Sequence, residues 1–370
     1  MRYLLATCVC LCVVLAAGAA DGADQDPGYI DVQIHLLITR QGKTPGVFSR
    51  GRQRNAAPGT AKMDADSQAM AAAERLLTLM DKYGVAQAML LPPPRMTQNQ
   101  YAGELDVLAR VVQAYPERFA LVGGGNILNE MIHIYSPEQV SQMVQRAFKG
   151  HVEDLVAKGV KAFGEIAALH LSFNDAHVFE ETLPDHPLFM LLMDLAAEHG
   201  IPIDLHMEAV VQTRDLPAGF SRVSSRNAKT LQGNIAAFER MLAHNRKARV
   251  VWLHNGWDNT GERSVELLKR LLTAHSNLYL ALRNEARTRT MAGTPMPNRM
   301  VDGQGKIKAD WLALFQAFPD RFVIGSDEFQ PPWDMRVPQS FAETWSLLKQ
   351  LPEDLARKIG RDNAARIYGL

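Results

Sequence analysis

Cysteine is nearly absent from this 370-residue chain, and the few that occur stand together. They are Cys8, Cys10 and Cys12, inside the apolar N-terminal stretch. If that stretch is removed, no cysteine remains, so disulfides and thiolate metal sites are excluded from the rest. Such a chain depends on its apolar core, and the remaining residues, about 345 of them, are ample for one large domain.

An excess of one charge sign is also missing, because 40 Lys and Arg balance 40 Asp and Glu. Net charge therefore gives no argument for a nucleic-acid or membrane partner. A hydrophobic content of 47% and a charged content of 22% are ordinary for a globular protein. We expect a small-molecule substrate and no nucleic acid, and the sequence permits a homodimer.

The N-terminal apolar run is short for a membrane span. Met1 and Arg2 give a minimal positive charge, an uncharged run follows from Leu4 to about Ala17, and "AAGAADGAD" comes next. This order is typical of a secretory signal peptide. We expect a signal peptide over residues 1–24, one domain over 25–370, export to the periplasm or medium, and no stable membrane insertion after cleavage. An uncleaved anchor is the alternative; a lipoprotein site before a cysteine lacks the usual preceding small residue.

Short β-rich runs alternate with segments of helical period. The expected strands are 29–36, 85–92, 119–125, 160–166, 201–207, 249–254, 277–282 and 321–327. The expected helices are 65–83, 103–115, 137–158, 187–199, 228–245, 261–274, 310–318 and 338–350. Glycine closes several helices directly before a strand, as in "DKYGV" and "AEHGI".

Eight such units predict an α/β fold, a (β/α)8 TIM barrel; an open doubly wound sheet is the alternative. Residues 37–64 and 283–309 are long for connections between a strand and a helix. In a barrel these long loops would lie over the C-terminal face, where active sites are found.

Ionisable or polar residues end several of the predicted strands. They are Gln33 and His35 on the first strand, Glu165 on the fourth, His206 on the fifth, His254 on the sixth and Asp327 on the eighth. Burying such groups unpaired costs several kcal/mol. Each alone has an ordinary explanation, such as an ion pair of Glu165 with Lys161 or a helix cap by Asp327. Together, at one rim of a barrel, they are most simply compensated by a metal ion.

The series "IDVQIH", "GEI", "IPIDLHME", "VVWLHNG" and "FVIGSDEF", closing with "IGRDNAARIYGL", resembles the amidohydrolase superfamily. It is most similar to the branch of metal-dependent hydrolases that also contains aromatic-acid decarboxylases and lactonases. The resemblance implies a (β/α)8 barrel with one divalent metal ion, zinc first and manganese as the alternative. It also implies that the first-strand pair, His206 and Asp327 bind the metal, while His254 orients water or substrate.

One position departs from that pattern, because Gln33 stands where the family has histidine. Glu165 occupies the fourth-strand position, where related barrels place a carboxylated lysine or a glutamate that bridges two metals. We therefore take His35, His206, Asp327, Gln33 and Glu165 as the predicted metal set.

The reaction implied by the resemblance is hydrolysis of an amide, lactone or ester, with decarboxylation of a metal-chelating acid as the alternative. Asp327 would take a proton from the attacking water and His254 would stabilise the carbonyl oxygen. The arginines of two loops, among them Arg214 and Arg283, favour an anionic substrate or are simply solvated.

Aromatic residues after the strand ends add to this picture. Trp257, Trp333 and Phe329 would form an aromatic wall beside the substrate or pack between loops. Gln33 indicates an alternative function, because an amide oxygen is a weak ligand for zinc. In this alternative the barrel has lost its metal and only binds ligands.

Overall fold

The computed structural model describes residues 28–38, 63–92, 104–175, 177–284, 287–332 and 340–370. The expected signal peptide, most of the expected loop 37–64 and Trp333 lie outside the described residues. Among the helices that are described, none combines the length and the apolar character that a membrane crossing needs.

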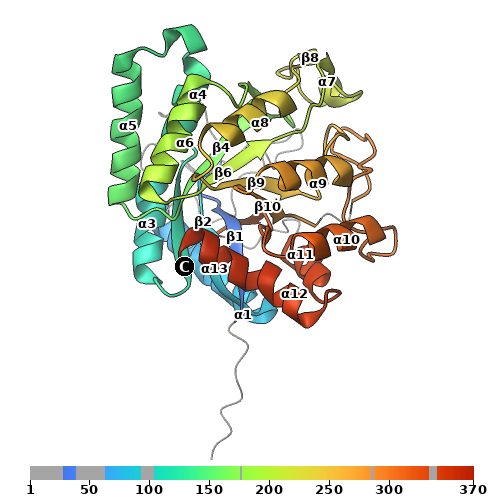
Figure 1. Ribbon diagram of the computed structural model, residues 1–370. Coiled ribbons are helices and arrows are strands. Elements are labelled where there is room, and N and C mark those ends of the chain that lie inside the picture. Colours follow the sequence, from blue (N-terminus) through green and yellow to red (C-terminus); the bar gives the residue numbers. More distant parts are fainter. Residues whose placement is uncertain (1–27, 39–62, 93–103, 176, 285–286, 333–339) are drawn as a thin grey trace, which may run out of the picture.

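Within the described residues, eight parallel strands form a closed barrel (Figure 1). They are β1 (Tyr29–Leu36), β2 (Val85–Leu90), β3 (Phe119–Gly124), β4 (Ala162–His170), β6 (Ile203–Met207), β9 (Val250–Asn255), β10 (Leu278–Leu282) and β11 (Phe322–Ile324). Neighbours follow chain order, and β11 returns to pair with β1 where Ile324 faces Asp31. The closure confirms the predicted (β/α)8 TIM barrel and excludes the open sheet.

Helices surround the barrel (Figure 1). Those expected from the sequence are α1 (Ala65–Tyr83), α3 (Glu104–Ala114), α5 (Gln142–Ala157), α6 (Pro187–His199), α8 (Ile235–His244), α9 (Val265–Ala274), α10 (Ala309–Ala317) and α11 (Ser340–Leu348). The C-terminal segment is helical as α12 (Glu353–Arg357), a π turn (Lys358–Asp362) and α13 (Asn363–Tyr368). Additional short elements are α4 (Ile127–Ile134), a 3₁₀ turn (Pro137–Gln139), α7 (Phe220–Val223), β5 (Glu180–Glu181), β7 (Arg214–Asp215), β8 (Thr230–Leu231) and β12 (Glu328–Gln330).

The helix ends follow from local chemistry. Asp64 caps α1 by accepting a hydrogen bond from the Ser67 backbone N–H at 2.7 Å, and Gly84 ends it with φ of +68°. Three expected helices begin later than predicted. α5 starts at Gln142, after the 3₁₀ turn Pro137–Gln139. The segment before α8 forms β8 instead, and α9 starts only after Ser264, whose side chain accepts from the Leu267 N–H.

The eighth barrel strand is interrupted where the site lies. β11 ends at Ile324, and the chain resumes as β12, which pairs in parallel with Ile34–Leu36 of β1. Asp327 stands in the gap with φ of +56°. Because the ladder is broken there, the Asp327 side chain is free to turn into the barrel mouth instead of alternating along a regular strand.

Two cores stabilise the fold. One lies between the strands and the surrounding helices, and a smaller one fills the barrel with residues such as Val32, Val251 and Val323. Ile367 and Tyr368 of α13 belong to this inner core, so the C-terminal helix seals the amino end of the barrel. The Tyr368 hydroxyl donates to the buried Asp204 carboxylate at 2.8 Å.

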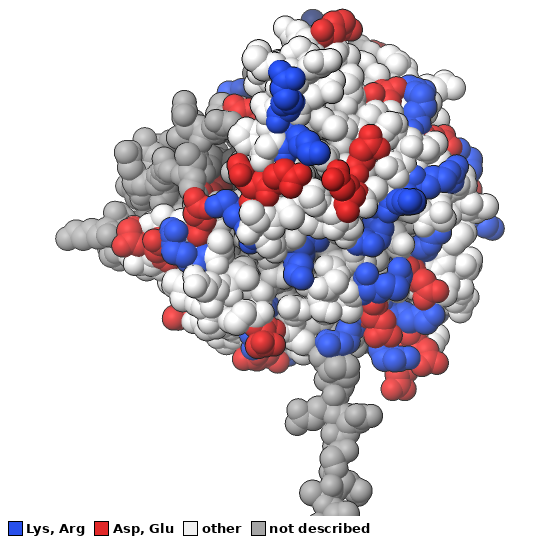
Figure 2. Space-filling view, turned by 60° about the vertical axis from the view of Figure 1, so that its left-hand side comes forward, with Lys and Arg blue, Asp and Glu red and all other residues white. Residues whose placement is uncertain are grey.

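Acidic and basic side chains are interspersed over the face shown in Figure 2. The polar groups that matter for chemistry are instead buried at the carboxyl end of the strands.

Candidate active site

The six polar residues predicted at the strand ends meet in one cluster. Gln33, His35, Glu165, His254 and Asp327 are each at most 6% exposed, and His206 is half-buried. They come from five different strands or strand ends of the barrel. The structure thus brings together every residue that we predicted as a metal ligand or catalytic group.

Glu165 is the centre of the cluster. One carboxylate oxygen, Oε1, lies 2.5 Å from His206 Nδ1 and 2.9 Å from His254 Nε2. The other, Oε2, lies 3.6 Å from His35 Nε2. The alternative pairing of Glu165 with Lys161 is wrong, since the Lys161 ammonium group donates to the Gly369 carbonyl at the other end of the barrel.

His35 and Asp327 form the second half of the cluster. His35 Nε2 lies 3.3 Å from Asp327 Oδ1, and the Phe329 ring stacks on the imidazole at 4.6 Å between centroids. The other oxygen of Asp327 accepts from Arg283, which reaches in from the loop after β10. His254 Nδ1 lies 3.8 Å from this same oxygen. The two halves therefore meet through His254.

Gln33 faces the cluster as well. Its amide nitrogen lies 3.4 Å from Glu165 Oε2 and 3.3 Å from His254 Nε2. The amide oxygen is buried without a hydrogen-bond partner among the described residues, as is His254 Nδ1. Each such orphaned polar atom costs about 1–3 kcal/mol. The amide oxygen carries lone pairs that a cation can use, and His254 Nδ1 is available to a cation or a substrate.

The backbone at two of the residues is strained. His254 and Asp327 both have positive φ, +58° and +56°, although neither is glycine. Such conformations cost of order 1–3 kcal/mol and concentrate at functional sites. At the end of a parallel strand this conformation turns the side chain out of the regular alternation.

Within the cluster, the pKa values of both carboxylates are lowered, and those of His254 and His35 shift in opposite directions. Burial opposes ionisation of Glu165, but hydrogen bonds from His206 and His254 outweigh it and hold its pKa well below the usual value. Burial likewise opposes ionisation of Asp327, and the Arg283 guanidinium is the main group that lowers its pKa. Burial lowers the pKa of His254. For His35, burial is outweighed by Asp327, so its pKa is raised.

The residues fit a divalent cation. His35 Nδ1 lies 3.0 Å from the Leu91 carbonyl, which can only accept, so Nδ1 carries the hydrogen and Nε2 presents a lone pair to two carboxylates. A lone pair aimed at carboxylates needs a positive charge between them, either a proton or a metal. A carbonyl on the far nitrogen is also the common support of a metal-binding histidine.

Distances agree with this interpretation. Donor atoms of Glu165, His206 and His254 all lie within 4.8 Å of one another. In a tetrahedral zinc site, bonds of 2.0–2.1 Å place the donor atoms about 3.3 Å apart. Glu165 and His206 of this trio belong to the predicted metal set, whereas His254 was expected to orient water or substrate.

The predicted substrate-binding residues take different positions. Arg283 contacts Asp327, and its guanidinium lies 4.2 Å from the Trp257 ring centroid. Arg287 packs on the same indole at 4.8 Å. Arg214, on β7, forms an ion pair with Glu262, and the Arg214 side chain is 40% exposed. Arg283 and Trp257 thus border the cluster, whereas the contact of Arg214 is with a surface carboxylate.

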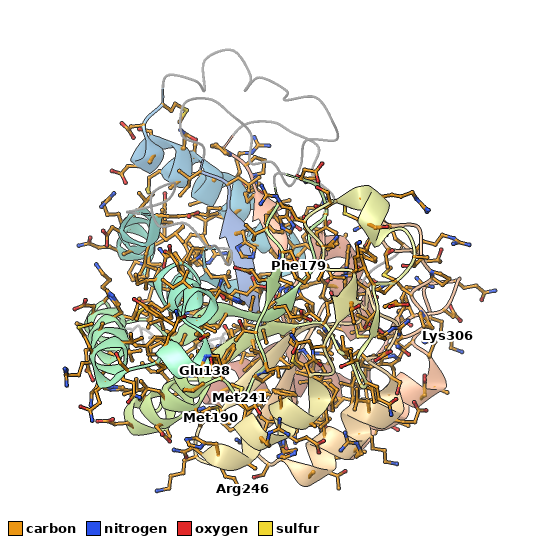
Figure 3. All side chains as sticks on the ribbon, turned by 90° about the horizontal axis from the view of Figure 1, so that it is seen from above. Glu138, Phe179, Met190, Met241, Arg246 and Lys306 are labelled. Carbon is orange, nitrogen blue, oxygen red and sulfur yellow. The ribbon has the colours of Figure 1, made fainter. Side chains whose placement is uncertain are left out.

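Elements beside the cluster add residues that are outside the predicted site set. His170 is the last residue of β4, and its ring lies 4.6 Å from that of His206. Buried Glu180 accepts from Asn129 at 2.7 Å. Seen from above, Phe179 lies toward the middle of the molecule, and Lys306 and Arg246 lie at its outer edge (Figure 3).

A parallel barrel with a buried cluster of imidazoles and carboxylates at its carboxyl end defines a barrel enzyme of the amidohydrolase type. The amidohydrolase family model matches residues 30–370, and the chain belongs to this family. A search of curated proteins gives no match.

Solved structures with similar folds include several hydrolases. The organophosphorus hydrolase from Deinococcus radiodurans has a TM-score of 0.51 at 14% identity, covering 92% of this chain and 92% of that one. A structure described as organophosphate hydrolysis activity engineered from a weak promiscuous lactonase template has a TM-score of 0.51 at 14% identity, covering 92% and 96%. A 2,6-dihydroxybenzoate decarboxylase complexed with 2,6-dihydroxybenzoate has a TM-score of 0.49 at 14% identity, covering 93% and 99%. At these identities the likeness concerns the fold alone.

Proposed function

We propose that this amidohydrolase is a metal-dependent hydrolase that cleaves an amide, lactone or ester of a small anionic substrate. The observation that carries the proposal is the Glu165 carboxylate with His206 at 2.5 Å, His254 at 2.9 Å and His35 at 3.6 Å. Zinc is the ion that this mixture of imidazole and carboxylate donors suits best, and manganese is the alternative.

Glu165, His206 and His254, together with His35 and Asp327, would hold the ion. When bound, a divalent ion would supply a Lewis acid that makes water a better nucleophile near neutral pH. Asp327 would accept a proton as the water oxygen bonds to the substrate carbonyl carbon. It would return that proton to the leaving group as the scissile bond breaks. His254 Nδ1, which has no hydrogen-bond partner among the described residues, would donate to the carbonyl oxygen and stabilise it.

Arg283 supports an anionic substrate. Its guanidinium lies beside the cluster, ordered by Trp257 and by Asp327. A guanidinium binds carboxylates through two parallel hydrogen bonds, so a substrate carboxylate can share or replace the Asp327 contact. A screen should therefore pair lactones, N-acyl compounds and aromatic carboxylates with matched neutral esters or amides. We expect the carboxylate member to be preferred and Arg283→Met to abolish the preference.

Metal content tests the proposal directly. Purified protein incubated with zinc or manganese and then desalted should retain about one ion per chain, and His206→Ala should lose both ion and activity. His244→Ala is the matched control, since His244 is a partly exposed histidine paired with Asp194. A wild-type chain that stays metal-free after both incubations contradicts the proposal.

Gln33 supports a second candidate, a barrel that binds ligands without catalysis. Its side chain places a neutral amide inside the cluster. Metal-free protein that binds carboxylates from the same panel but turns none of them over would favour this candidate. Loss of CO₂ from an aromatic carboxylate in that panel would instead indicate the decarboxylase alternative.

We also propose that the chain is exported. The support is the N-terminal order of a minimal charge, an apolar run and small residues. Expression with and without residues 1–24, followed by fractionation and N-terminal sequencing, tests this: the full chain should appear outside the cytoplasm with a new N-terminus near residue 25. Retention of Met1 would contradict it.

A further inference from the structure

A buried arginine lies directly behind the cluster. Arg263 follows β9 in the segment before α9 and is only 2% exposed. Its guanidinium lies 4.6 Å from the Trp252 ring centroid. Burying a charge is costly unless its hydrogen bonds are satisfied, so the contacts of this side chain indicate what it does.

The guanidinium bridges the ends of two barrel strands. Nη1 donates to the carbonyls of Leu253 at 2.9 Å and His254 at 2.8 Å, at the end of β9. Nη2 donates to the Met207 carbonyl at 2.5 Å, at the end of β6. Met207 directly follows His206, so one planar group links the backbone of two histidines of the cluster.

These bonds stabilise the strained backbone of His254. Its carbonyl accepts from Arg263 and also from the Trp257 N–H at 3.0 Å. Two donors on one carbonyl hold the left-handed conformation that aims the imidazole at Glu165. The Met207 carbonyl is likewise bonded twice, by Arg263 and by the Trp252 indole N–H at 2.7 Å.

The charge and backbone of Arg263 are fixed in turn. Buried Glu208 and Asp258 supply the opposite charge, and Asp258 Oδ2 accepts from the Arg263 N–H at 3.0 Å. Asp258 Oδ1 accepts from Gly261 at 3.0 Å, which closes the turn that leads to Arg263. The segment 258–263 is therefore built to deliver a guanidinium to the strand ends.

We infer that Arg263 is a positioning residue, which sets the separation and orientation of His206 and His254 by bridging the carbonyls at the ends of β6 and β9. That the two histidines then receive a metal ion rests on the proposed function; the positioning itself does not. Lysine cannot replace arginine here, because a single ammonium nitrogen cannot span both strand ends as a planar fork does.

A second arginine offers a matched control. Arg321 donates from Nη1 to the carbonyls of His275 at 3.2 Å and Leu278 at 2.7 Å, and its guanidinium lies 5.4 Å from the Tyr279 ring centroid. Like Arg263, it donates to backbone carbonyls beside an aromatic ring, but at the amino end of the barrel, far from the cluster along the strands. Arg321→Lys thus measures what a lost guanidinium bridge costs in stability alone.

The test compares Arg263→Lys with Arg321→Lys in the full-length protein. Zinc and manganese affinities are measured by competition with a chelating dye, unfolding by heat, and the ring Cε1–H resonances of His206 and His254 by NMR on metal-free protein. Arg263→Lys should weaken metal binding roughly 10- to 100-fold, the usual effect of losing an outer-shell support, and should shift both resonances. Arg321→Lys should lower the melting temperature without either change.

Each outcome decides a different point. If both variants lose stability alike while affinity and resonances stay at wild-type values, Arg263 is a structural residue and the inference is overturned. If wild-type protein binds no ion, the proposed function fails, and the NMR shifts alone judge the positioning role. If Arg263→Lys does not fold, Asp258→Asn, which loosens the Arg263 backbone, should show the same changes to a smaller degree; wild-type values there overturn the inference.

Discussion

At the carboxyl end of the barrel, polar side chains from three other strands converge on Glu165, whereas at the amino end α13 inserts Ile367 and Tyr368 among apolar strand residues. The carboxyl end contains strained backbone at His254 and Asp327 and orphaned atoms on Gln33 and His254. At the amino end, the Tyr368 hydroxyl donates to Asp204. Strained backbone and unpaired polar atoms at the carboxyl end thus lower the stability of the fold, and the packing of α13 at the amino end raises it.

The largest expected effect is that of Asp327→Asn, which should lower turnover at the carboxyl end. Asparagine keeps the shape of the side chain but cannot accept the proton, so kcat should fall by about 10²–10⁴-fold. Asp320→Asn is the control, since Asp320 is an exposed aspartate paired with Lys358 just before β11, at the opposite end of the same strand. The measurement is turnover of the best substrate from the screen; wild-type turnover by Asp327→Asn would remove Asp327 from the mechanism.

Ile367→Ala, at the amino end, should lower stability without changing turnover. Ile367 is fully buried in the inner core, and truncating such a side chain costs about 2–5 kcal/mol. Urea unfolding monitors the loss, while metal stoichiometry and turnover of the remaining folded protein should match the wild type. A loss of metal without a loss of stability would show that the two ends are not independent.

Glu180 makes the stability of the carboxyl end depend on pH. Burial raises its pKa from 4.5 to about 7. Because the folded state keeps the proton more tightly, the free energy of unfolding falls as pH rises from 4.5 to about 7, by on the order of 3 kcal/mol in total. Glu180→Gln, which keeps an acceptor for Asn129, should be insensitive to pH in this way.

Urea unfolding of chelator-treated protein at several pH values checks this expectation. The advantage of Glu180→Gln over the wild type should grow between pH 4.5 and 7 and then level off. A constant difference across that window would contradict it.

Gln33→His should have the smallest effect, a tightening of zinc binding by roughly tenfold, because imidazole is a stronger zinc ligand than an amide. Gln33→Leu, which removes the polar atoms at similar size, should give no tightening. Competition with a chelator measures both. Equal affinities in wild type and Gln33→His would mean that the cluster binds its ion without this position.

The fold was predictable because its signals are local. Each of the eight barrel strands coincides with an expected run, and glycines such as Gly84 and Gly200 mark helix ends where they were expected. The misplaced starts of α8 and α9 follow from turn and cap interactions, such as that of Ser264, which compete with helical periodicity. Loop conformation depends on those contacts and not on a repeating pattern.

The cluster was predictable for its members but not for its arrangement. Parallel strands bring their carboxyl ends together, so strand-end residues such as His206 and Asp327 had to be near one another. Which donors meet at 2.5–3.6 Å depends on rotamers and on the positive φ of His254, and neither is written in the residue pattern. Arg263 was missed for the same reason. It donates to backbone carbonyls, and because every residue has one, no residue pattern marks these partners.

The packing of α13 against the amino end of the barrel also constrains how the chain folds. Residues 364–368 complete the inner core, and β1 pairs with residues from 324 to 330 near the far end of the chain. A polypeptide emerging from a ribosome cannot form these contacts until residues 324–368 have been synthesised, so the barrel closes through contacts of very high sequence separation. Deleting residues 364–370 should therefore leave a chain that remains accessible to proteases.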